Sequence, residues 1–251
     1  MLTKNAEPLR PFLSDKLKLN WKFSISLLLL VCIPRFYLVL KANVTQNYSS
    51  IGLIMLLSGL IPFVFLNKSG LKEIGVCTPN KYYKLLFCLI IGILFSYILY
   101  LIGINLFGVT YENWYVYIRE SYNIPNIISI DDKMTLFIIM SITGMIFSPL
   151  GEELFFRGLV HTGLSNSLGN RFATVIDSLS FALVHISHFG ILYINDSWKF
   201  YPMPTIIWVI SMFIVSLLFI KMKNWTHSIW GAVVGHAGFN LGMIYAIFYL
   251  I

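Results

Sequence analysis

The 251-residue chain is 57% hydrophobic and only 12% charged, with a mean hydropathy of +0.77 and a net charge of +7. Soluble domains carry about a quarter charged residues, so this composition excludes a soluble enzyme and a disordered chain and indicates a polytopic membrane protein. Because the basic residues gather in short loops, the positive charge is typical of membrane topology and of contact with a lipid bilayer, and we expect no nucleic-acid partner.

Seven apolar stretches approach the length of about 20 residues that a helix needs to cross a bilayer. They are roughly Phe23–Leu40, Ser50–Leu66, Tyr83–Phe107, Met134–Val160, Phe172–Ile186, Pro204–Ile220 and Thr226–Leu250. An eighth span results if the long fourth stretch breaks near Pro149 and Gly151, because a proline followed by a glycine can end a helix. The sequence therefore predicts an all-α, polytopic transmembrane helix bundle of 7–8 spans.

Lysine and arginine are distributed unevenly among the connecting loops. The tail 1–22, the loop 67–84 and the residues after the sixth stretch are rich in lysine, whereas the loops 41–49 and 108–133 carry little net positive charge. Positive loops favour the cytoplasmic side of a membrane. We therefore expect a multi-pass protein of the cell membrane with a cytoplasmic N-terminus, while the loop 188–203 favours neither side.

Ionisable residues within the apolar stretches are concentrated in the second half of the chain. Such residues are costly inside a bilayer and are candidates for function. In the first half, Arg35 beside Pro34 is the exception, and it either snorkels to the membrane surface or lines a cavity. The second half contains Glu152, Glu153, Arg157, Asp177, His185, His188, His236 and Asn240.

The segment SPLGEELFFRGLV places an acidic pair and a basic residue at helical spacing. Glu153 and Arg157 are four residues apart, so they can pair on one face of a helix. Glu152 points about 100° away from Glu153, and no cation lies near it in the sequence. A lone carboxylate in apolar surroundings takes up a proton readily, which suits a general base. The alternative is a pair of structural glutamates where a helix meets the membrane surface.

Two further segments place polar side chains on one helix face. Phe181 and His185 are four residues apart, and so are His236 and Asn240. Glycines around His236 permit close helix packing in a bilayer. The structural alternative is that these histidines and the asparagine only hold helices together or lie at the membrane interface.

Together these side chains form a suitable set for peptide hydrolysis. A glutamate assisted by a histidine can deprotonate water, and a second histidine and an asparagine can stabilise the oxyanion, each by about 3 kcal/mol. Glu152, His185 and His236 would equally suit a catalytic zinc with an open position. The sequence does not separate the two chemistries. Asparagine is a poor zinc ligand, so the expectation is no cofactor, with zinc as the alternative.

The order EExxxR, FxxxH, HxxxN resembles the motifs of the CPBP family of intramembrane proteases, the CAAX-processing and bacteriocin-processing group also called Abi. The resemblance covers roughly residues 134–250 and implies that Glu152 activates water and that His185 orients it. It also implies an oxyanion site at His236 and Asn240. The supporting residues would be Glu153, Arg157 and Phe181.

Three functions follow from these observations. The first is an intramembrane endopeptidase acting on a membrane-associated peptide or protein. The second is a non-catalytic membrane protein of the same fold, such as a bacteriocin immunity factor or scaffold. The third is a transporter or channel, which the absence of an inverted repeat in the sequence makes the least favoured. The division into domains is a cytoplasmic tail (1–22), N-terminal transmembrane helices (23–133) and a catalytic transmembrane core (134–251).

Overall fold

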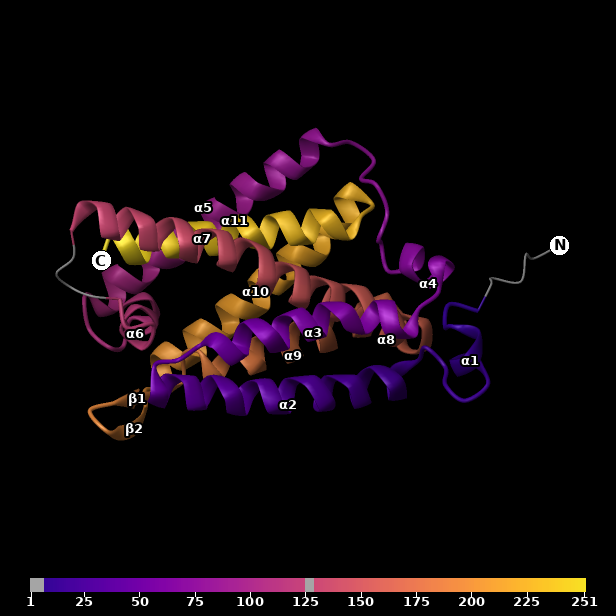
Figure 1. Ribbon diagram of the computed structural model, residues 1–251, viewed down its shortest axis with the longest axis horizontal. Helices are drawn as coiled ribbons and strands as arrows, with labels where there is room; N and C mark the ends of the chain where they lie inside the picture. The colour runs from indigo at the N-terminus through magenta and orange to yellow at the C-terminus, as the bar shows by residue number, and fades with distance from the viewer. Residues whose placement is uncertain (1–6, 125–128) are drawn as a thin grey trace.

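The computed structural model describes residues 7–124 and 129–251, and helices dominate it (Figure 1). The helices are α1 (Pro11–Ser14), α2 (Trp21–Thr45), α3 (Ser49–Phe65), α4 (Lys68–Glu73), α5 (Tyr83–Phe107), α6 (Trp114–Ser121), α7 (Ile130–Glu153), the π-helical η1 (Leu154–Val160), α8 (His161–Leu168), α9 (Asn170–Val184), the 3-10 turn η2 (His185–Ser187), α10 (Pro202–Thr226) and α11 (Ile229–Tyr249). The strands β1 (Ile191–Ile194) and β2 (Ser197–Phe200) form an antiparallel hairpin. The predicted all-α fold is thus confirmed, with this hairpin as an addition that the sequence analysis did not foresee.

Five helical segments are long and apolar enough to cross a membrane: α2, α5, the continuous segment Ile130–Leu168, α10 and α11. Helix α3 is apolar but has only 17 residues. The stretch predicted at 172–186 corresponds to α9, which has 15 residues and is shorter than a bilayer crossing needs. The predicted count of 7–8 spans is therefore not confirmed.

The fourth apolar stretch does not end at Pro149, because α7 continues through it to Glu153 and then runs into η1 and α8. Tight packing against α3 supports the helix at this point. A Cβ atom added to Gly151 would overlap the backbone carbonyl of Met55, and one added to Gly59 would lie 3.2 Å from the Cα of Gly151. Gly151 therefore serves close helix contact here and does not terminate the helix.

The glycines that follow His236, Gly238 and Gly242, pack against α5, as the sequence led us to expect for a neighbouring helix, whereas Gly231 faces α10. A Cβ atom on Gly238 would overlap the carbonyl oxygen of Leu89, and one on Gly92 would overlap that of Gly235. Small residues let the two backbones approach this closely. The glycine contact fixes how α11 is rotated, and His236 and Asn240 line the central pocket of the bundle.

The lysine-rich segments meet at one end of the molecule. Near the N-terminus, the backbones of Leu9 and Leu66 form an isolated bridge, and farther along the chain the amide of Asn80 donates to the carbonyl of Thr226 at 3.0 Å. The hairpin, α6 and the C-terminus lie at the opposite end (Figure 1). Residues 1–6 of the predicted tail and 125–128 of the loop 108–133 lie outside the described residues.

Candidate active site

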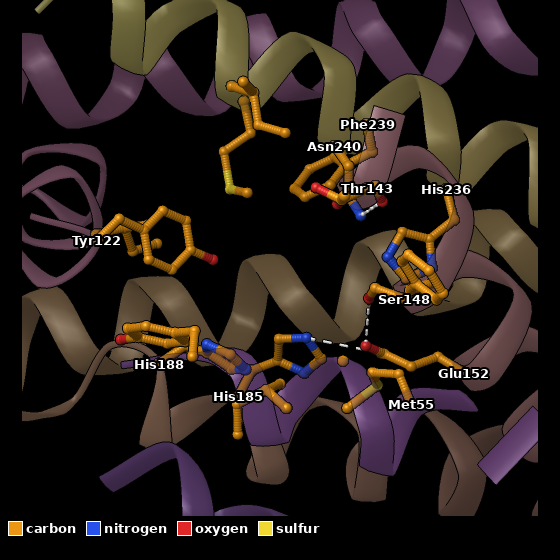
Figure 2. Close-up of a pocket in the computed structure, with 18 of the residues that line it drawn as sticks. Met55, Tyr122, Thr143, Ser148, Glu152, His185, His188, His236, Phe239 and Asn240 are labelled. Carbon is orange, nitrogen blue, oxygen red and sulfur yellow. Dashed lines mark hydrogen bonds and ion pairs between the residues drawn. The ribbon is translucent and has the colours of Figure 1, made fainter. Parts of the chain in front are cut away.

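A cavity of about 400 Å³ lies inside the helix bundle, and all four residues predicted to be catalytic line it. Glu152 comes from the end of α7, His185 from the start of η2, and His236 and Asn240 from α11. Figure 2 shows Glu152 and His185 on one side of this space and His236 and Asn240 across it. The structure therefore brings together side chains that are separated by up to 88 positions in the sequence.

Glu152 is buried and its two carboxylate oxygens have different surroundings. Oε1 accepts hydrogen bonds from Arg35 Nη2 at 2.9 Å and from Ser148 Oγ at 2.7 Å. Oε2 has no hydrogen-bond partner among the described residues, and it lies 3.8 Å from Nε2 of His185. No cation lies near Glu152 in the sequence, but Arg35 reaches it from α2 in the folded chain.

His185 is held in one orientation by the backbone. Its Nδ1 lies 2.6 Å from the carbonyl oxygen of Phe181, and Trp208 Nε1 donates to the carbonyl oxygen of His185 at 3.1 Å. A carbonyl oxygen only accepts, so Nδ1 carries the proton and Nε2 is an acceptor. The ring of Phe181 packs 4.3 Å from the imidazole, as the predicted spacing on one helix face requires.

His236 is held by the second glutamate. Its Nδ1 donates to Glu153 Oε1 at 2.8 Å, and Arg157 Nε lies 3.2 Å from Glu153 Oε2. The predicted Glu153–Arg157 pair is thus present, and both side chains are fully buried. The ring of Phe219 stacks on His236 with 4.8 Å between the centroids. The other ring nitrogen of His236 points toward the pocket (Figure 2).

Arg157 sits behind the pocket among aromatic rings and acids. Its guanidinium lies 4.1 Å from the ring centroid of Phe181, and its Nε is 3.8 Å from Asp177 Oδ2. Cation–π contacts and carboxylates together can keep a buried guanidinium charged. Arg157 therefore lies behind the cavity, whereas Phe181 contacts Arg157 and also lines the cavity.

Asn240 reaches from α11 toward α7. One N–H of its amide donates to the carbonyl oxygen of Gly144 at 2.9 Å. A primary amide has a second N–H, and that group stays available for a ligand in the pocket. Figure 2 shows the Asn240 amide beside Thr143 at the upper wall of the cavity.

Two pocket residues, Ser148 and Tyr122, were not identified from the sequence, and a third, His188, was named there only among the ionisable residues of the second half. Ser148 precedes Glu152 by four residues, a helical spacing that could have indicated its contact. His188 and Tyr122 line the far end of the cavity, where the Tyr122 hydroxyl points inward (Figure 2). Burial, with a smaller contribution from the negative charge of Glu152, raises the pKa of Tyr122 to about 12, so this phenol stays neutral. The residues around Tyr122 in the sequence form no pattern that could have indicated its place in the cavity.

The zinc alternative does not fit this arrangement. Among residues 7–124 and 129–251, no group of three His, Cys, Asp or Glu side chains is placed to hold a metal ion. Arg35 lies against one oxygen of Glu152, and Glu153 holds Nδ1 of His236.

Neither the curated proteins nor the solved structures contain a match to the chain. A comparison with protein-family models does give one, over residues 134–242, and the family is described as type II CAAX prenyl endopeptidase Rce1-like. The match includes all three motifs that the sequence analysis singled out. Over these residues the chain is therefore similar to the Rce1-like type II CAAX prenyl endopeptidases, which are the CPBP family.

Proposed function

We propose that the protein is an intramembrane endopeptidase that hydrolyses a peptide bond of a membrane-associated peptide or protein in the central cavity. The observation that carries this proposal is the convergence of Glu152, His185, His236 and Asn240 on one buried space. The family match supports protease chemistry of the CAAX type. Apolar residues such as Met55 and Phe147 line the same cavity, which suits a substrate that is itself partly apolar.

The gap between Glu152 and His185 suits a water molecule. The 3.8 Å between Oε2 and Nε2 is too long for a direct hydrogen bond, and both atoms are acceptors. A water between them would donate one proton to each, so that its lone pair faces the substrate. Glu152 would take a proton as the water oxygen bonds to the carbonyl carbon, and would return it to the amine as the C–N bond breaks. General base and acid catalysis of this kind contributes about 10²–10⁴-fold.

The opposite wall would stabilise the negative charge on the former carbonyl oxygen. Glu153 holds Nδ1 of His236, so the other ring nitrogen faces the cavity (Figure 2) and would donate to the oxyanion when it carries a proton. The free N–H of Asn240 would be the second donor. Because both groups are fixed by contacts before substrate arrives, they need no reorganisation as charge develops.

Glu152→Gln tests the proposal in the purified full-length protein reconstituted in liposomes. The assay presents a set of membrane-protein peptides, including farnesylated peptides that end in a CAAX sequence, and mass spectrometry detects new termini. We expect the wild type to cleave at least one peptide and Glu152→Gln to lose about 10³-fold or more of this activity, since a neutral amide cannot act as a base. His236→Ala should lose about 10²–10³-fold.

Glu112→Gln is the matched control, because Glu112 is an exposed glutamate outside the cavity. It should cleave at the wild-type rate. Cleavage by Glu152→Gln at the wild-type rate would overturn the assignment of the base. A different result would show a binding role without hydrolysis. In that case wild type and Glu152→Gln would reverse the cellular phenotype of a gene deletion equally well.

A further inference from the structure

Arg35 lies in the N-terminal half of the chain, outside the residues that match the family. It is the buried basic side chain of α2, and its guanidinium reaches the carboxylate of Glu152. We propose that Arg35 is the positioning residue of the base: it keeps Glu152 ionised inside the bilayer and aims its second oxygen at His185. This inference rests on the proposed peptidase function, and its test includes a measurement that needs no substrate.

The geometry of the carboxylate supports the aiming role. Arg35 and Ser148 both donate to Oε1, so that oxygen is fixed from two directions. Oε2 is left without a hydrogen bond among the described residues and faces Nε2 of His185. A carboxylate rotates as one plane about its Cγ–Cδ bond, so anchoring one oxygen also sets the position of the other. Arg35 thus determines which oxygen is available to a water.

The charges around the cavity support the ionising role. Among the described residues, Arg35 and Glu152 are the only Asp, Glu, Lys or Arg residues that line the cavity. Only 3% of the Arg35 side chain and 2% of the Glu152 side chain are exposed. The nearby Glu153, Arg157 and Asp177 contact one another behind the pocket and do not line it. An isolated buried carboxylate gains a proton rather than remain charged, and a protonated acid cannot accept one from water. The base therefore depends on the cation that α2 delivers.

A second buried contact of α2 provides a control for a purely structural role. The Asn43 amide donates to the carbonyl oxygen of Ser187 at 2.9 Å and so ties α2 to the turn that carries His185. Asn43 does not touch Glu152 and does not line the cavity. Asn43→Ala weakens the attachment of α2 without changing the charge beside Glu152.

Infrared spectroscopy measures the charge on Glu152 directly. The difference spectrum of Arg35→Met minus the double variant Arg35→Met, Glu152→Gln should contain the C=O band of a protonated carboxylic acid. The difference between wild type and Glu152→Gln should contain ionised carboxylate bands in its place. An ionised Glu152 in Arg35→Met would overturn the proposal. If Arg35→Met does not fold, Arg35→Gln, which keeps an N–H donor and loses the charge, takes its place.

Kinetics measure the consequence on the peptide that the wild type cleaves fastest. We expect Arg35→Met to lower kcat about 10²-fold or more while KM stays within about threefold, because the arginine acts through the base and not on the substrate. Arg35→Lys, which keeps the charge, should recover kcat to within about tenfold of wild type. Asn43→Ala should stay within about threefold of wild type.

Three kinetic results would contradict the inference. They are a wild-type kcat in Arg35→Met, a change confined to KM, and a loss in Asn43→Ala as large as that in Arg35→Met. The failure of the inference is distinguishable from failure of the proposed function. An inactive Glu152→Gln beside a fully active Arg35→Met removes only the role of Arg35, whereas an active Glu152→Gln removes the peptidase mechanism itself.

Discussion

Two adjacent glutamates have different partners, and this divides their roles. Neighbouring residues on a helix point about 100° apart. Glu152 therefore meets Arg35 and the cavity, whereas Glu153 meets Arg157 and His236 on another side. These contacts support the proposal that Glu152 is the base, and they show that Glu153 contacts a histidine and an arginine.

Arg157→Met should destabilise the protein strongly. The arginine is fully buried between Glu153, Asp177 and the ring of Phe181, so its removal leaves two buried carboxylates without their cation. Breaking a buried pair in this way costs about 3–5 kcal/mol. Thermal or denaturant unfolding in detergent measures the change. Arg171→Met, at an exposed arginine of α9, is the control and should stay within about 0.5 kcal/mol of wild type; an equal effect of the two substitutions would contradict the buried network.

The sequence predicted which side chains would line one cavity, but it did not predict all of their contacts. Spacing of four residues on one helix indicated the Glu153–Arg157 pair, which the structure shows. The contact of Arg35 with Glu152 joins positions 117 apart. No local pattern encodes such a contact, because it depends on how α2 and α7 pack in three dimensions.

Helix α11 owes its position to a glycine face against α5. Glycines permit the two backbones to touch, and the pocket residues His236 and Asn240 belong to the same helix. A shift of α11 would move both of these side chains at once. The α5–α11 interface therefore helps to determine where His236 and Asn240 lie.

Gly238→Ala should therefore destabilise the bundle. The new Cβ atom would overlap the carbonyl of Leu89, and overpacking of this kind costs about 1–3 kcal/mol. Gly52→Ala in α3 is the matched control, because no atom lies within 4 Å of a Cβ at that position. Alanine is favoured over glycine in a helix by about 1 kcal/mol, so this variant should be as stable as wild type or slightly more so. Unfolding midpoints in detergent distinguish the two, and equal midpoints would contradict the close α5–α11 contact.

Apolar runs in the sequence predicted the long helices correctly, but they did not predict the hairpin or the ends of α9. Long runs correctly indicated α2, α5, α10 and α11. The hairpin was missed because its strands have four residues each, and its signal was a two-residue turn, Asn195 and Asp196, in which both residues have positive φ. Helix α9 was predicted as a span because hydrophobicity does not reveal where a helix ends, at Gly169 and at the turn carrying His185.

The whole molecule separates its lysine-rich segments from its other loops. At one end, backbone hydrogen bonds join the tail to residues 65–67 and join the 75–80 segment to the α10–α11 turn. The hairpin and the C-terminus lie at the other end (Figure 1). This arrangement agrees with the loop charges and supports the proposal that the lysine-rich end faces the cytoplasm.

Cysteine labelling in intact cells tests this orientation. The three free cysteines, Cys32, Cys77 and Cys88, are first replaced by alanine. A membrane-impermeant maleimide should then label a cysteine at the exposed Asp196 in intact cells, and one at the exposed Asp15 only after permeabilisation. The opposite pattern would invert the orientation, and labelling of both sites from outside would contradict the placement of the two segments at opposite ends.

The π-helical turn η1 changes which neighbours the continuous helix Ile130–Leu168, which carries both glutamates, can contact. A π turn contains about one residue more than the α-helical turn it replaces, so it changes the angular phase of everything beyond it. Helix α7, before η1, contacts α3 and α11, and helix α8, after η1, contacts α2 and α9. One uninterrupted helix can thereby satisfy two sets of neighbours that an ideal helix could not face simultaneously. Deleting a single residue from 154–160 would force one set of contacts out of alignment, although the deleted residue need not touch any reacting group.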